Sequence, residues 1–143
     1  MGLDMYLEGR KGISSRWDNK DEQIKEDGFV VKAHVLDLGY WRKHPDLHGF
    51  IVQEFANGVD ECQGIYLCED DLQKIIETVE KDEIPTGVEG FFFGKSYAPG
   101  ESDEIYSYEQ QKANDLAIFD KALKWLKSAP TGEWREVYYE ASW

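Results

Sequence analysis

The sequence predicts a single α+β domain over residues 1–143, with a mixed, mostly antiparallel sheet and about three helices packed on it. The chain has the length of one domain, and 41% of its residues are hydrophobic, which is enough to form a core. Segments typical of strands are interspersed with three segments of helical periodicity. Their order lacks the strict strand–helix–strand repetition of parallel sheets, and this favours an antiparallel arrangement.

Four segments have the composition of strands. Residues 3–8 alternate apolar and polar side chains, as expected for a strand with one buried face. After a polar loop over residues 10–28, residues 29–40 are rich in β-branched and aromatic types and predict a longer strand. A short strand is expected at residues 64–68 and a last one at residues 134–142. We expect the first, second and last of these segments to share one sheet.

Three segments predict helices. The first begins near Pro45, because proline is favoured in the first turn, and ends at Asn57-Gly58, a pair that readily adopts left-handed backbone. The second covers residues 70–80 and the third residues 108–127, both with apolar residues three or four positions apart. Each helix has one apolar stripe, so we expect all three to cover the same face of the sheet.

Aromatic residues form two further patterns. Three phenylalanines lie between glycines at residues 90–94. A buried strand is the favoured interpretation, and a stacking platform for a planar ligand is the alternative. Near the C-terminus, Tyr139 and Trp143 either close a pocket or attach the end of the chain to the core.

The net charge of −13 excludes several classes of partner. Duplex affinity comes largely from Lys and Arg, so we expect no nucleic-acid binding; mimicry of a nucleic acid by the acidic surface is the minor alternative. No apolar run approaches the roughly 18 residues that cross a bilayer, and we expect no membrane association. The start of the chain lacks the basic and apolar regions of a secretory signal. An intracellular, reducing location is therefore expected.

Metal and cofactor binding are not expected either. Cys62 and Cys68 are too few for a disulfide framework or a four-cysteine zinc site. His44 and His48 are four residues apart, but Pro45 places His44 at or before the helix start, so the two rings need not converge. No third ligand has a recognisable spacing. We therefore expect no metal and no cofactor.

The best candidate for a ligand site is the stretch "YWRKHPDLHGF" at residues 40–50. Arg42 and Lys43 lead into a helix N-terminus, where free backbone N–H groups already favour negative charge, and His48 lies in the first turn. In an acidic protein, an anion can approach only where local positive charge overcomes the repulsion. The alternative is that both cations are solvated and paired with acids. Aromatic side chains are expected around the site, namely Tyr40, Trp41 and Tyr139.

A second cluster, "NGVDEC", follows the same helix. Asn57 is typical of a turn, and with Asp60 it joins the candidate ligand-binding residues. We assign no catalytic residue, but a Cys–His nucleophile pair of Cys62 and His48, with Asp60 as a carboxylate, is the alternative. Free cysteines are usually buried and inert, which favours the first interpretation.

Five sequence blocks, in this order, resemble a family of small proteins encoded by bacteriophages and prophages: "MGLDMYL", "YWRK", "NGVDEC", "GFFFG" and "YYEASW". The resemblance implies a phage accessory protein in the cytoplasm of the host bacterial cell. Members often carry the label phosphoglycerate kinase, but this chain is far shorter than that enzyme and lacks its phosphate-binding chemistry. The chain departs from the family pattern at His44-Pro45-Asp46 and in an acidic insertion at residues 95–111.

Two classes of function are compatible with these features. In the favoured class, a non-enzymatic accessory protein binds a host protein or a small anionic, nucleotide-like ligand and counteracts host defence. In the other, a small enzyme acts on an anionic metabolite or nucleotide. Arg42 and His48 would then bind its charge, and Asp60 or Cys62 would perform the chemistry.

Overall fold

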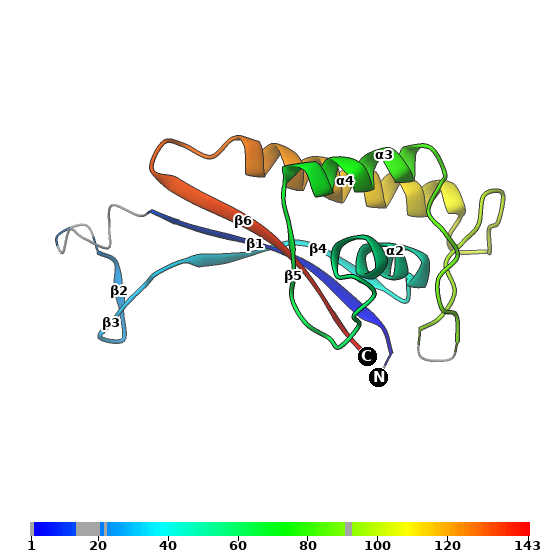
Figure 1. Ribbon diagram of the computed structural model, residues 1–143, viewed down its shortest axis with the longest axis horizontal. Helices are drawn as coiled ribbons and strands as arrows, with labels where there is room; N and C mark the ends of the chain where they lie inside the picture. The colour runs from blue at the N-terminus through cyan, green and yellow to red at the C-terminus, as the bar shows by residue number, and fades with distance from the viewer. Residues whose placement is uncertain (1, 14–20, 22, 91–92) are drawn as a thin grey trace.

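The computed structural model describes residues 2–13, 21, 23–90 and 93–143 (Figure 1). Its main sheet has four strands in the order β4-β1-β6-β5, and every neighbouring pair is antiparallel. A separate two-stranded sheet pairs β2 with β3. These findings confirm the predicted α+β domain. The strands are β1 (Asp4–Ile13), β2 (Lys25–Glu26), β3 (Phe29–Val30), β4 (His34–Arg42), β5 (Ile65–Leu67) and β6 (Glu133–Ser142).

The three predicted helices are α2 (Pro45–Phe55), α3 (Glu69–Glu80) and α4 (Tyr108–Lys127). Pro45 is in the first turn of α2, and Asn57 and Gly58 have positive φ just beyond its end, as the sequence predicted. Helix α4 begins with a capping box, in which the Ser107 side chain accepts a hydrogen bond from the backbone N–H of Gln110. None of the helices in the described part of the chain is long and apolar enough to cross a membrane.

Two strand boundaries differ from the prediction. Strand β1 continues to Ile13, so the predicted loop at residues 10–28 was wrong at its start. The extra residues form ladders on both sides, with Arg10 opposite Val35 and Glu136, and this pairing outweighs their polar composition. The predicted strand at 29–40 is divided, because its first two residues pair with β2. Much of the predicted loop, residues 14–20 and 22, lies outside the described residues.

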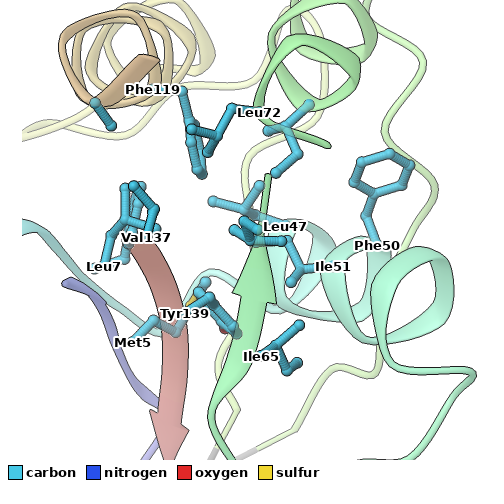
Figure 2. Close-up of a cluster of buried hydrophobic side chains, with 14 of the residues drawn as sticks. Met5, Leu7, Leu47, Phe50, Ile51, Ile65, Leu72, Phe119, Val137 and Tyr139 are labelled. Atoms are coloured by element: carbon cyan, nitrogen blue, oxygen red, sulfur yellow. The ribbon is translucent and has the colours of Figure 1, made fainter. Parts of the chain in front are cut away.

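The helices cover one face of the main sheet. Leu3 just before β1 and Met5 and Leu7 within it are fully buried, whereas Tyr6 is 38% exposed. Side chains from the same face of β5 and β6 join α2, α3 and α4 in one core (Figure 2). The prediction that the helices share one face of the sheet is thus confirmed, and no helix of the described part of the chain covers the opposite face, where Tyr6, Tyr40 and Tyr66 are exposed.

A long connection, residues 81–107, leads from α3 to α4. Gly90 and Gly94 form an isolated antiparallel bridge within it. Residues 91–92 of the expected phenylalanine strand lie outside the described part of the chain, and Phe93 packs against the core. The connection passes close to the start of α2, where the backbone N–H of Gly87 donates to the Asp46 carboxylate at 2.7 Å. The connection therefore brings residues that are distant in the sequence to the end of β4.

Candidate functional site

A pocket of about 490 Å³ opens between the end of β4, the 94–97 segment and the first half of α4. Its size is in the range of small-molecule sites, about 300–1,000 Å³. Cationic side chains lining it are Arg42, Lys43 and Lys95. The aromatic members are Tyr40, Trp41, Tyr97 and Tyr106. The remaining lining residues are His44, Gly94, Gln111, Asn114 and Asp115. Among the described residues that line the pocket, Asp115 alone is acidic, in a chain whose net charge is −13.

The turn from β4 into α2 places Lys43 at the pocket. Lys43 has φ of 53°, a left-handed conformation that few residues with a side chain adopt. Its backbone N–H donates to the Leu3 carbonyl at 2.8 Å, which holds the turn against the start of β1. A Cβ on Gly94 would lie 2.5 Å from the Lys43 Cβ, so only glycine allows the 94–97 segment to approach this closely.

Asp4 connects the two residues of β4 on the rim of the pocket. The Tyr40 hydroxyl donates to Asp4 Oδ1 at 2.5 Å, and the Arg42 guanidinium donates to the same oxygen at 2.9 Å. The hydrogen bond from Tyr40, followed by that from Arg42, holds the pKa of the Asp4 carboxyl below its ordinary value of 3.8. These three side chains are solvent-accessible, so the ion pair is weak and open to competition by another anion.

Tyr40→Phe is expected to raise the pKa of Asp4 towards 3.8, because it removes the hydrogen bond from the Tyr40 hydroxyl, which is the largest cause of the lowered pKa. A carboxyl whose pKa is lowered on folding stabilises the fold above its unfolded pKa. It loses that contribution as the pH falls through the folded value. An NMR titration of the Asp4 carboxyl measures the change. Tyr6→Phe is the matched control, since the Tyr6 ring packs at a tilt against Tyr40 and does not bond to Asp4. An equal shift of the Asp4 pKa in both variants would contradict the assignment.

Behind the pocket lies a buried hydrogen-bond network centred on His44 and Asp115. His44 Nε2 is 2.8 Å from Asp115 Oδ2, and the Trp41 indole N–H donates to Asp115 Oδ1 at 2.8 Å. His44 Nδ1 is 2.7 Å from the Ser96 hydroxyl, which also accepts the backbone N–H of Asp46 at 3.0 Å. Ser96 therefore satisfies one of the free N–H groups at the start of α2.

The donors in this network can be assigned from its geometry. Because Ser96 Oγ accepts from the backbone, its proton is best placed on the line to His44 Nδ1. His44 then carries its own proton on Nε2 and donates it to the Asp115 carboxylate. Both ring nitrogens of His44 and both oxygens of Asp115 are occupied. The network thus fixes the pocket wall, and the proton directed at His44 Nδ1 is that of the Ser96 hydroxyl.

A second buried network surrounds His48 on α2. Its Nδ1 is 2.6 Å from the Tyr139 hydroxyl and its Nε2 is 2.9 Å from Asp60 Oδ2. The Trp143 indole N–H donates to Asp60 Oδ1 at 3.3 Å, and the Trp143 ring lies 6.0 Å from that of Phe93. Burial, with a smaller effect from the Asp60 charge, raises the pKa of Tyr139. This network attaches β6 and the C-terminal residue to α2, which is one of the two roles expected for Tyr139 and Trp143.

The structure divides the residues nominated from the sequence. Tyr40, Trp41, Arg42 and Lys43 line the pocket. The other four nominated residues are not among its lining residues. His48, Asp60 and Tyr139 meet in the second network, and Asn57 is an exposed turn residue beyond α2.

The two histidines diverge for the reason that the sequence suggested. His44 precedes the helix, with φ of −114° and ψ of 70°, so it does not share a helical face with His48. Among the described residues, no group of three or more His, Cys, Asp or Glu side chains could hold a metal ion. Cys62 and Cys68 are both free. Of the alternative catalytic residues, His48 bonds to Asp60 through Nε2, and its other ring nitrogen bonds to Tyr139 and not to Cys62.

The half of the pocket that lies far from β4 in the chain was not predicted from the sequence. Lys95, Tyr97 and Tyr106 lie within the acidic segment of residues 95–111, whose sequence up to the start of α4 has no periodicity to indicate where it folds. Asp115 had a detectable signal: it precedes the buried Phe119 by four residues and therefore lies on the apolar stripe of α4. A carboxylate in that position requires buried donors.

Comparisons of the chain with protein families, with curated proteins and with solved structures found no match. The phage-protein resemblance accordingly stays an expectation from the sequence blocks.

Proposed function

We propose that the chain is a non-enzymatic accessory protein that binds a small, anionic, nucleotide-like ligand in the pocket between β4 and α4. The observation that carries this proposal is the composition of the pocket: three cations and four aromatic rings line about 490 Å³ in a chain of net charge −13. Cations attract a phosphate, and aromatic faces stack on a planar base. In the host bacterial cell, sequestering such a ligand would counteract a host defence that depends on it.

The burial of Ser96 favours binding over catalysis. His44 lies between Ser96 and Asp115 as the base of a serine–histidine–aspartate triad would, so its Nδ1 is placed to accept the proton of the Ser96 hydroxyl. Ser96 is only 4% exposed and does not line the pocket, so it is poorly placed to act as a nucleophile. In the enzyme alternative, His48, Asp60 and Cys62 would act from outside the pocket, which makes that alternative weaker.

Isothermal titration calorimetry with purine and pyrimidine nucleoside monophosphates tests the proposal. We expect a monophosphate to bind, and we expect its two halves, the uncharged nucleoside and inorganic phosphate, to bind more weakly. Only the whole ligand contacts the aromatic rings and the cations of the pocket at the same time. The double variant Lys43→Gln/Lys95→Gln should weaken binding by at least about tenfold, since a hydrogen bond to a charged group contributes about 1.5–3 kcal/mol.

The matched control is Lys121→Gln/Lys127→Gln, which removes the same charge from exposed positions on α4 that do not line the pocket. We expect the affinity of this control for the monophosphate to change by less than about twofold, because exposed charges outside the pocket are largely screened by salt. Equal weakening in both double variants would contradict the pocket as the site. Absence of binding for every monophosphate would contradict the ligand class.

A further inference from the structure

The uncovered face of the main sheet carries one tyrosine from each strand. Tyr6 on β1 stands opposite Tyr40 on β4, with ring centroids 5.4 Å apart. Tyr138 on β6 stands opposite Tyr66 on β5, with ring centroids 5.6 Å apart. Tyr6, Tyr40 and Tyr66 are 38%, 46% and 52% exposed. We call these four residues the tyrosine face. Exposed tyrosines on an open sheet are typical of a protein-binding surface, because tyrosine is enriched in interfaces.

Carboxylates alternate with these rings. In the register of β1 and β6, Glu140 is opposite Tyr6, and Glu8 is opposite Tyr138. On its other side, Glu8 is opposite Asp37 of β4, which places two like charges side by side. Like charges directly opposite each other destabilise a sheet unless a cation lies between them. No ion pair or side-chain hydrogen bond to Glu8 or Glu140 is found within the described part of the chain.

Besides the Arg42 guanidinium, which pairs with Asp4 beside Tyr40, the tyrosine face holds a guanidinium stacked on one of its rings. The Arg10 guanidinium lies 4.7 Å from the centroid of the Tyr138 ring, within the distance at which a cation is attracted by an aromatic face. The hydroxyl of Tyr138 donates to Glu136 at 3.0 Å, so ring and carboxylate act together near the cation. This arrangement shows the chemistry that the rest of the face offers to a cation from outside.

The geometry points to a docking surface for an arginine-containing, basic segment of a partner protein. It adjoins the pocket at Tyr40, whereas Tyr6, Tyr66, Glu8 and Glu140 do not line the pocket. Tyrosine rings would stack on guanidinium groups while Glu8 and Glu140 pair with their charge. Charge decides among the occupants. A second copy in a symmetric dimer would place these carboxylates against themselves, and a nucleic acid would bring further negative charge.

Fluorescence anisotropy with a labelled peptide of alternating arginine and glycine tests this surface, and the corresponding lysine peptide measures the preference for guanidinium. We expect Glu8→Gln/Glu140→Gln to weaken arginine-peptide binding by about tenfold. Glu80→Gln/Asp120→Asn, which removes equal charge from exposed positions on α3 and α4, should weaken it by less than about twofold. Tyr6→Ser/Tyr66→Ser should abolish the preference for arginine over lysine, since the rings attract the planar guanidinium more strongly.

Three outcomes would overturn the inference, provided that each variant keeps the wild-type circular dichroism spectrum and melting temperature. Equal weakening by both charge variants would mean that the peptide responds only to net charge. An unchanged arginine preference in the tyrosine variant would remove the rings from recognition. A dimer in sedimentation analysis that dissociates in Glu8→Gln/Glu140→Gln or Tyr6→Ser/Tyr66→Ser would assign the face to a second copy of this chain.

Discussion

Asp115→Ala is expected to lower the free energy of unfolding by about 3 kcal/mol, because it leaves two buried donors without an acceptor. The Trp41 indole N–H and His44 Nε2 both bond to the Asp115 carboxylate at 2.8 Å, and Asp115 is only 4% exposed. An unsatisfied buried polar group costs about 1–3 kcal/mol. Urea denaturation followed by circular dichroism measures the change.

Asp120→Ala is the control for this substitution. It makes the same chemical change on α4, but at an exposed position, and its effect should stay within about 0.5 kcal/mol of zero. If Asp115→Ala cost no more than Asp120→Ala, the network of His44 and Trp41 would not stabilise the fold. The pocket wall would then not be held by the Asp115 carboxylate.

Gly87→Ala is expected to destabilise the protein by about 2–3 kcal/mol, within the range for overpacking. A Cβ at residue 87 would lie 2.1 Å from the Pro45 carbonyl oxygen and 2.9 Å from the Asp46 backbone nitrogen. These are backbone atoms of the first turn of α2, so they cannot move aside as a flexible side chain would. The long connection between α3 and α4 would have to separate from α2 there. Thermal or urea denaturation measures the loss.

Gly64→Ala provides the comparison, because a Cβ at residue 64 meets no atom within 4 Å. We expect this variant to remain within about 1 kcal/mol of the original protein. A similar loss in both variants would indicate that backbone conformation, rather than the close approach at Gly87, determines the effect. An unaltered stability in Gly87→Ala would contradict the packing of the connection against α2.

The fold was predictable where burial imposes a period on the sequence. Helix α4 covers the predicted residues, since its apolar side chains recur on one face and its capping residues mark the start. Strand β1 was predicted too short, because residues beyond Arg10 are held by backbone pairing to two neighbours and need no apolar pattern. The division between β3 and β4 was missed for a related reason: β-branched composition alone does not say which strand a segment joins.

The candidate site was only half predictable. Arg42 and Lys43 could be nominated, because a local run of cations before a helix is visible in one stretch of sequence. Their partners across the pocket could not, since Lys95 and Tyr97 reach it through a connection without periodicity. His48 was grouped with Arg42 and Lys43 because it lies in the first turn of the helix that follows them. In the structure its ring bonds to Tyr139 on β6, an interaction that depends on how the helix is rotated against the sheet.

The indole N–H resonance of Trp41 gives the most direct test of the claim that the pocket between β4 and α4 binds a small anionic ligand. Trp41 lines the pocket and is fixed by Asp115, so a bound ring or phosphate should alter its environment. In ¹⁵N-labelled protein, titration with a nucleoside monophosphate should shift the Trp41 indole resonance and the backbone amide resonances of residues 94–97. The backbone amide resonance of Tyr139 should not shift. A saturating titration that leaves Trp41 and residues 94–97 unchanged, or that shifts Tyr139 most, would contradict the account.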